Sequence, residues 1–423
     1  MDFLDKLVLP QSLEHIALLH YMAIIILFLF VPFFSIVLGG SILSLFFKRK
    51  GKKSANEFYT KFSKEVIAYT TFTKWAGVGL GVIPIAALIL IYAQILHNLI
   101  QFTIPLFVGA VVLIAVGLIF IYAYRKGWVS ADASSVSKIS SKSAYVGIIF
   151  LLIGSCFFIT GLNLALNDGD RNAVNSLFIF SSFVKWIQLV TAALSLTGSF
   201  LLFIYFFWEG GKEISDPNYK ELIKKTGLSI TLFFALFQPL FLLINLVSLP
   251  SLALSSSVFG FAILSLLAVF WVYHLLYAML KNGEMHFSGI VFLLLVLASL
   301  FLIISEQASF SNVTKKQALI LSVEYETVLN KLKGEQKGIE AISGADIFNG
   351  RCSACHKFDQ KLVGPPYKET LPNYNGDVEK VAAFVLNPTK VNPAYPPMPN
   401  QGLKPAEARA IAKYILEEVK KYQ

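Results

Sequence analysis

The sequence predicts an all-α protein in two parts: a polytopic helical membrane domain of about eight spans, followed by a small helical domain outside the membrane. Three observations lead to this fold class. The chain of 423 residues is 56% hydrophobic and only 15% charged, whereas about 25% of residues are charged in typical soluble domains. The shortage of charge is concentrated before residue 306. After that point come a polar helical stretch and a short domain that ends in an amphipathic helix.

Long apolar runs, each able to cross the hydrocarbon core of a bilayer, make up the first part. They lie at about 17–47, 74–99, 102–124, 143–166, 178–208, 227–249, 255–280 and 287–305. The second and third runs are separated only by a short stretch from His97 to Thr103, so a re-entrant pair or a different total stays open. Polar groups are scarce in these runs. Lys185, near the outer end of the fifth run, is expected to extend to the interface, and no buried glutamate is expected.

Loops rich in lysine and arginine alternate along the chain with loops that contain almost none, and this alternation predicts the orientation in the membrane. The loops after the first, third and fifth runs are rich in lysine, whereas the linkers near His97, at 167–175 and at 250–257 contain one arginine among them. Positive loops stay in the cytoplasm, so with eight spans both termini lie in the periplasm, outside a bacterial inner membrane. The formal net charge of +10 therefore reflects topology, and we expect no nucleic-acid partner.

The predicted domains are a multi-span membrane domain at 1–305, a periplasmic helical stalk or linker at 306–340, and a compact domain at 341–423. The stalk is inferred from apolar residues at helical spacing between Thr314 and Lys333. Glycines at 334, 338 and 344 interrupt this pattern before the last domain.

The last domain contains the pentapeptide Cys352-Ser-Ala-Cys355-His356. Two thiols at this spacing followed at once by a histidine are typical of covalent c-type haem attachment. Each thiol adds across a vinyl group of the haem, and His356 becomes the proximal ligand of the iron. The motif therefore predicts a haem protein that transfers electrons. The remaining cysteine, Cys156, stands alone in the fourth run and is expected to be an ordinary buried residue.

The sequence around this motif resembles the small class I cytochromes c, and the resemblance covers 341–423. It is carried by Gly344, Phe348 and Gly350 before the motif, and after it by Val363-Gly-Pro-Pro-Tyr367, by Tyr395-Pro-Pro-Met-Pro399 and by an amphipathic helix from Pro405 to about Tyr422. The resemblance implies one covalently bound haem c in a small periplasmic cytochrome c domain. It also implies attachment of the haem outside the cytoplasm, which agrees with the orientation predicted from the loops.

The resemblance further assigns roles to individual residues. Met398 is implied as the second axial ligand of the iron, together with His356, and a His/Met pair raises the reduction potential relative to two histidines. The carbonyl of Pro365 is implied as the hydrogen-bond acceptor that holds the His356 ring. Phe348 and Tyr414 are expected to meet where the first and last helices of the domain cross.

Two histidines of the membrane domain, His20 and His97, are predicted to lie at a similar depth near the periplasmic face. Three interpretations stay open. The two imidazoles bind a haem b, or they contact a quinol headgroup with Gln94 and Asn98 nearby, or they are interfacial side chains hydrogen-bonded to backbone or water.

Part of the membrane domain also resembles, locally, subunit I of cytochrome bd-type quinol oxidases. The similarity rests on His20 followed by Phe28-Leu-Phe-Val-Pro32, on the segment 72–81 and on the composition of 183–208. Lys185 and Trp186 stand where that family would offer a haem-ligating histidine, and the Gly-Arg-Gln-Pro quinol signature is missing. The resemblance therefore implies a descendant that has lost the oxidase haems.

Two functions follow from these features. In the favoured one the chain is an electron-transfer subunit of a respiratory complex rather than a stand-alone enzyme: its helices dock a quinol-oxidising or iron–sulfur partner, and the haem passes electrons to a periplasmic acceptor or terminal oxidase. Helices without internal polar sites usually pack against lipid or other subunits, which favours this function. In the alternative the chain oxidises quinol itself, with a haem b or quinol site near His20 and His97. A simple anchor for a cytochrome would need only one helix.

Overall fold

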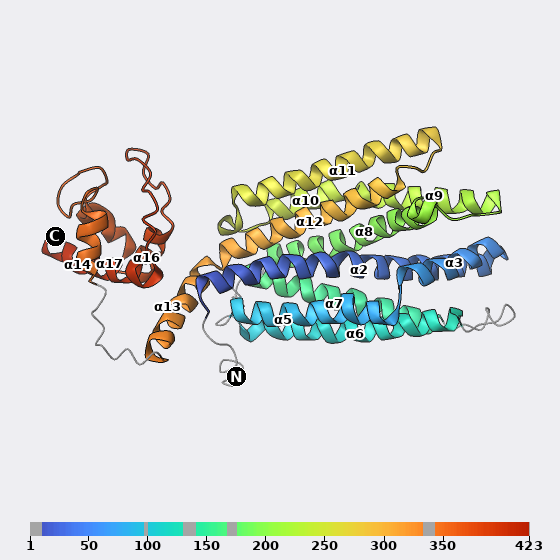
Figure 1. Cartoon of the computed structure of the whole chain (residues 1–423), viewed down its shortest axis with the longest axis horizontal. Coiled ribbons are helices and arrows are strands. Elements are labelled where there is room, and N and C mark those ends of the chain that lie inside the picture. Colours follow the sequence, from blue (N-terminus) through green and yellow to red (C-terminus); the bar gives the residue numbers. More distant parts are fainter. Residues whose placement is uncertain (1–10, 97–99, 130–140, 167–175, 333–342, 423) are drawn as a thin grey trace. The chain divides into compact units, whose positions relative to one another are not determined.

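The computed structural model describes residues 11–96, 100–129, 141–166, 176–332 and 343–422, and these residues form helices, turns and coil without any strand. They divide into two compact units. One unit spans Leu18–Thr314, and the other joins the chain up to Ala17 with Lys315–Gln423. Figure 1 shows the first unit as a bundle of long helices and the C-terminal domain as a cluster of short ones.

The first unit is built from long helices that run along one another (Figure 1). The helices are α2 (Leu13–Ser54), α3 (Glu57–Thr70), α4 (Lys74–Ala76), α5 (Ile83–Ile95), α6 (Ile100–Val129), α7 (Lys142–Leu166), α8 (Ser176–Phe206), α9 (Pro217–Ala235), α10 (Gln238–Val247), α11 (Ser256–Asn282) and α12 (Ser288–Val313). Among the described residues, eight stretches are long and apolar enough to cross a membrane: Leu13–Ser54, Lys74–Ile95, Thr103–Trp128, Lys142–Leu166, Phe178–Phe206, Pro217–Val247, Ser256–Asn282 and Ser288–Val313. The predicted number of spans is confirmed.

Several helices extend beyond the apolar runs that predict them. α2 has 42 residues and is therefore roughly 63 Å long at 1.5 Å per residue, about twice the thickness of the hydrocarbon core. The sixth span begins at Pro217, because the Asp216 side chain accepts hydrogen bonds from two backbone N–H groups of the first turn. The lysines at 220, 224 and 225, predicted to lie in a loop, are thus part of α9. α12 likewise continues to Val313, past the predicted end at 305.

The second and sixth spans are interrupted helices. A π-helical segment, Gly77–Val82, joins α4 to α5, and a break at Leu236 and Phe237 separates α9 from α10. Pro239 has no N–H, so the carbonyl of Ala235 loses the partner that a continuous helix would give it. The Tyr273 hydroxyl donates to that carbonyl at 2.7 Å. The side chain from α11 therefore satisfies a backbone group that the bilayer could not.

Glycines allow neighbouring spans to approach closely. Gly117 of α6 and Gly147 of α7 face each other, and a Cβ atom added to either would lie 3.0–3.1 Å from the carbonyl oxygen of the other. A Cβ atom on Gly39 of α2 would lie 2.2 Å from the Thr197 hydroxyl of α8. Small residues at such positions let backbones come together without a hydrophobic driving force.

Basic and aromatic side chains gather at one end of the bundle. The ammonium of Lys48 lies 5.5 Å from the ring centroid of Tyr124 and 5.3 Å from that of Trp128, which joins the end of α2 to the end of α6. On α3, the Glu65 carboxylate accepts hydrogen bonds from the hydroxyls of Tyr205 and Tyr219, which belong to α8 and α9. These contacts join α2 to α6, and α3 to α8 and α9.

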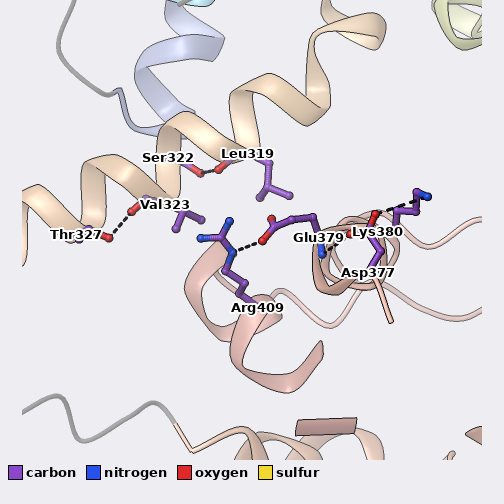
Figure 2. Close-up of polar contacts among 8 residues, drawn as sticks. All are labelled: Leu319, Ser322, Val323, Thr327, Asp377, Glu379, Lys380 and Arg409. Carbon is purple, nitrogen blue, oxygen red and sulfur yellow. Dashed lines mark hydrogen bonds and ion pairs between the residues drawn. The ribbon is translucent and has the colours of Figure 1, made fainter. Parts of the chain in front are cut away.

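The second unit contains α13 (Lys315–Leu332), α14 (Gly344–Ile347), a π-helical turn (Phe348–Cys352), α15 (Tyr367–Thr370), α16 (Val378–Leu386) and α17 (Pro405–Glu418). The predicted helices at 314–333 and after 405 are present. The apolar faces of α16 and α17 form a core around Ile411 and Ile415. Arg409 of α17 pairs with Glu379 of α16 at 2.5 Å, and Figure 2 shows this pair beside Leu319 and Val323 of α13, which packs against α17.

Replacement of Gly147 by alanine should destabilise the membrane unit. The new methyl group would lie 2.8 Å from the Ile121 side chain and 3.0 Å from a backbone carbonyl of α6, so the two helices must separate. We expect a loss of about 1–3 kcal/mol in the free energy of unfolding, seen as a lower melting temperature in detergent. Gly260→Ala on α11, where the methyl group meets nothing within 4 Å, is the matched control and should leave stability unchanged or raised. Equal melting temperatures for the two variants would contradict the close packing of α6 on α7.

Candidate functional site

One cavity of the C-terminal domain is lined by the four residues that the sequence assigns to haem: Cys352, Cys355, His356 and Met398. The lining comes from three segments, namely the helical turn that carries the two cysteines, the loop around Pro365, and the loop around Met398. Arg351 connects the first segment to the third, because its guanidinium donates a hydrogen bond of 2.8 Å to the carbonyl of Gln401. The fold thus brings together residues that are up to 46 positions apart, from Cys352 to Met398.

The two cysteines lie on a tight turn. The backbone N–H groups of Cys355 and His356 both donate to the carbonyl of Cys352, at 3.1 and 2.9 Å. Cys352 is buried and Cys355 is half-buried. Burial raises the pKa of the Cys352 thiol, and the charge of Arg351 opposes this only in part. Both sulfur atoms therefore sit on the wall of the same cavity in a fixed order along the chain.

The His356 ring is held on three sides. Its Nδ1 atom lies 3.2 Å from the carbonyl oxygen of Pro365, and its plane stacks on Tyr367 with ring centroids 4.9 Å apart and an angle of 8°. A Cβ atom on Gly364 would lie 2.3 Å from the ring, so only glycine fits there. Because a carbonyl can only accept, Nδ1 carries the proton and Nε2 presents a lone pair.

The donor set of this cavity fits a covalently bound haem. It offers two thiols for the vinyl groups, an imidazole Nε2 and a thioether sulfur. Burial lowers the pKa of His356, while the hydrogen bond to Pro365 works in the opposite direction. The imidazole is therefore neutral at pH 7, as an iron ligand must be.

The helices around the cavity cross closely. Phe348 and Tyr414 meet with ring centroids 5.8 Å apart, which confirms the predicted contact. A Cβ atom on Gly344 would lie 2.4 Å from the backbone carbonyl oxygen of Ala410. This glycine therefore allows α14 to cross α17 at short distance and fixes where the cysteine turn begins.

The two histidines of the membrane domain are only partly described. His20 lies on α2 and is half-buried, with its ring edge-on to Phe310 of α12 at 5.8 Å between centroids. His97 and Asn98 lie outside the described residues. The pairing of His20 with His97 stays a prediction.

The membrane unit contains a polar cavity that the sequence analysis missed. Lys185, expected to extend to the interface, instead lines this cavity together with Glu306 and Gln188. Glu306 was assigned to the stalk because it follows the last apolar run, but α12 carries it along the bundle. The spacing of Lys185 and Gln188, one helical turn apart, is the signal that could have indicated a polar face.

Comparison with known proteins bears on the C-terminal domain. Residues 341–418 match the family model of cytochrome c. Cytochrome c-551 of Pseudomonas denitrificans is 32% identical over 78 residues, which cover 18% of this chain and 95% of that protein. The figures are the same for cytochrome c-551 of Azotobacter vinelandii, and cytochrome c-551 of Pseudomonas aeruginosa is 32% identical over 73 residues, covering 16% of this chain and 70% of that protein. No solved structure matches the chain.

Replacement of Gly364 by alanine should disturb the His356 ring. The methyl group would overlap the ring and force it away from the Pro365 carbonyl. We expect the haem absorption spectrum to change and the free energy of unfolding of the domain to fall by about 1–3 kcal/mol. Gly350→Ala is the control, since a Cβ atom there meets nothing within 4 Å. A spectrum identical to that of the unmodified protein would refute the packing of Gly364 on the ring.

Proposed function

We infer that this chain, which belongs to the cytochrome c family through its C-terminal domain, is a membrane-anchored electron-transfer subunit of a respiratory complex. Family membership implies a haem cofactor and electron transfer, and the eight long apolar helices indicate membrane anchoring. The proposed cofactor is one haem c, bound covalently by Cys352 and Cys355.

The observation that carries this proposal is the common cavity of the two cysteines, His356 and Met398. The haem supplies an iron that gains and loses one electron. His356 and Met398 are proposed as its axial ligands, and Pro365 keeps the His356 ring in the tautomer that leaves Nε2 free for the iron. Tyr367, stacked on the same ring, limits its rotation. The protein thus contributes ligation, burial and a fixed imidazole rather than acid–base catalysis.

We propose that the protein lies in a bacterial inner membrane with both termini in the periplasm. The basic loops after the first, third and fifth spans support this orientation. Arg49, near the end of α2, lies 4.7 Å from the ring centroid of Tyr145 at the start of α7, and Lys212, after α8, lies 3.6 Å from that of Tyr69. Basic residues that follow the first and the fifth spans therefore lie over aromatic rings, as expected for side chains at a membrane interface.

We propose other subunits of the complex as the immediate partners. A quinol-oxidising or iron–sulfur subunit would supply the electrons, so the quinol pool is reached indirectly. A periplasmic carrier or terminal oxidase would accept them. Large apolar side chains such as Phe270, Trp271 and Leu293 are exposed on α11 and α12, which offers a surface to lipid or to another subunit.

The alternative function, quinol oxidation by this chain with a haem b or quinol site near His20 and His97, has one supporting observation. Phe310, which contacts His20, also lines the polar cavity of the membrane unit. In that case the chain would be an enzyme, and its haem c would accept electrons from within the same polypeptide.

Replacement of Met398 by alanine should leave the haem attached and lower its potential. A thioether ligand favours reduced iron, so its loss should shift the midpoint by a measurable part of the roughly 0.8 V range that axial ligands control. A redox titration of the full-length protein measures this shift. Met285→Ala, in the membrane unit, is the control. An unchanged midpoint potential in the Met398 variant would refute the ligand assignment.

Replacement of Cys355 by alanine should impair covalent attachment, because only one thioether bond to the haem can then form. The haem that stays with the polypeptide on a denaturing gel should decrease relative to the unmodified protein. Cys156→Ala removes a cysteine of α7 in the other unit and should have no effect. Equal retention of haem in both variants would exclude Cys355 from the attachment site.

A further inference from the structure

The polar cavity of the membrane unit has a volume of about 160 Å³. It lies among α2, α7, α8, α10 and α12, at the end of the bundle where α7, α10 and α12 end and α8 begins. Most of the lining is aliphatic, with side chains such as Leu162, Leu189, Leu242 and Ile303. A cavity of this size admits a six-membered ring, since an engineered cavity of about 150 Å³ binds benzene.

Within this apolar wall, several polar atoms have no partner among the described residues. Gln188 and Asn245 are hydrogen-bonded to each other through Oε1 and Nδ2, which leaves the Nε2 donor of Gln188 and the Oδ1 acceptor of Asn245 unpaired. The hydroxyl of Ser309, a residue 1% exposed, is also unpaired. The Oε1 acceptor of Gln307, which lines the same cavity, is unpaired as well. An unsatisfied buried polar group costs about 1–3 kcal/mol, so four of them on one cavity point to a ligand that both donates and accepts hydrogen bonds.

Two charged residues complete the lining. Lys185 and Glu306 line the same cavity, yet no ion pair within 4.0 Å joins them in the described part of the chain. The cavity therefore offers an amino group and a carboxyl group in addition to the amides. A ligand that only accepts hydrogen bonds would leave the acceptors of Asn245 and Gln307 unpaired.

The same lining argues against a metal centre. It contains no histidine, cysteine or methionine, and the described residues form no group of three or more metal-binding side chains. A haem b in this cavity would lack its usual axial ligands. An organic molecule with polar groups on an apolar body therefore fits this lining better than a metal does.

We propose that this cavity binds the ring of a lipid-soluble quinone. The carbonyl oxygens of a quinone accept from Gln188 Nε2, Lys185 and Ser309, and the hydroxyls of the reduced form donate to Asn245 Oδ1 or Glu306. The isoprenoid tail follows the leucine-rich wall. This site goes beyond the electron-transfer function proposed above and does not depend on it, because it uses no residue of the haem cavity.

The test uses the purified full-length holoprotein, and the probe is a decyl-substituted 1,4-benzoquinone titrated in detergent. Leu246 lines the cavity, whereas Leu243 on the same helix is 54% exposed. Leu246→Trp fills the space and should weaken binding about tenfold or more, in line with the loss of a ring-sized site. Leu243→Trp should bind like the unmodified protein.

A second pair of variants distinguishes a loss of quinone affinity from a loss of stability of the protein. Ser309→Ala removes an unpaired hydroxyl, so it should weaken quinone binding by roughly three- to tenfold without lowering the melting temperature. Ser305 lines the same cavity, but its hydroxyl already donates to the Val258 carbonyl at 2.9 Å. Ser305→Ala should therefore leave the affinity unchanged.

The site is supported if one quinone binds saturably and its affinity falls in Leu246→Trp and Ser309→Ala but not in Leu243→Trp and Ser305→Ala. Equal binding by all four variants, or uptake that rises without saturation, would overturn it. So would a tightly bound phospholipid that the quinone fails to displace, detected by mass spectrometry. Haem content and midpoint potential, measured on the same samples, report separately on the electron-transfer function.

Discussion

The cavity of the C-terminal domain depends first on the hydrogen bond between His356 Nδ1 and the Pro365 carbonyl. It decides which nitrogen of the imidazole faces the cavity, and every other feature of the cavity supports it. The Gly364 N–H donates to the Cys355 carbonyl at 2.8 Å, so the loop that carries Pro365 is fastened to the cysteine turn itself. Absence of a side chain on Gly364 lets that loop lie directly against the ring. A cysteine pair and a histidine next to each other in sequence are thereby held in a fixed arrangement on one cavity wall.

The membrane unit follows a different constraint, because the bilayer offers no water to backbone groups. At two interruptions in this unit, a side chain from a neighbouring helix supplies a partner for a backbone carbonyl. The Tyr273 hydroxyl donates to the Ala235 carbonyl at the break before Pro239, and Asn312 donates to the Ala253 carbonyl at 3.0 Å. Unpaired polar atoms occur elsewhere in the described part of this unit, for example on Trp128 and Ser288. Those of Gln188, Asn245, Gln307 and Ser309 differ because all four residues line one cavity.

Much of this architecture could be predicted from the sequence. Apolar runs gave the eight spans, because length and hydropathy are local properties. That the two cysteines, His356 and Met398 line one cavity could be predicted, because the first three are adjacent and Met398 lies in a proline-rich loop typical of the family. The helix ends could not be predicted as well, since Asp216 extends α9 by capping and α12 runs on through polar residues. The cavity was missed because Lys185, Asn245 and Glu306 lie on three helices and meet only in the folded unit.

The account can be tested most directly by a pyridine haemochrome spectrum of the purified full-length chain, with haem quantified per polypeptide. We predict one haem c for each chain and no haem b. The membrane unit would then be an anchor and a docking scaffold, and its bound ligand would be a quinone rather than a haem. A haem b signal near one equivalent would contradict the account and would make His20 and His97 the first residues to examine as ligands.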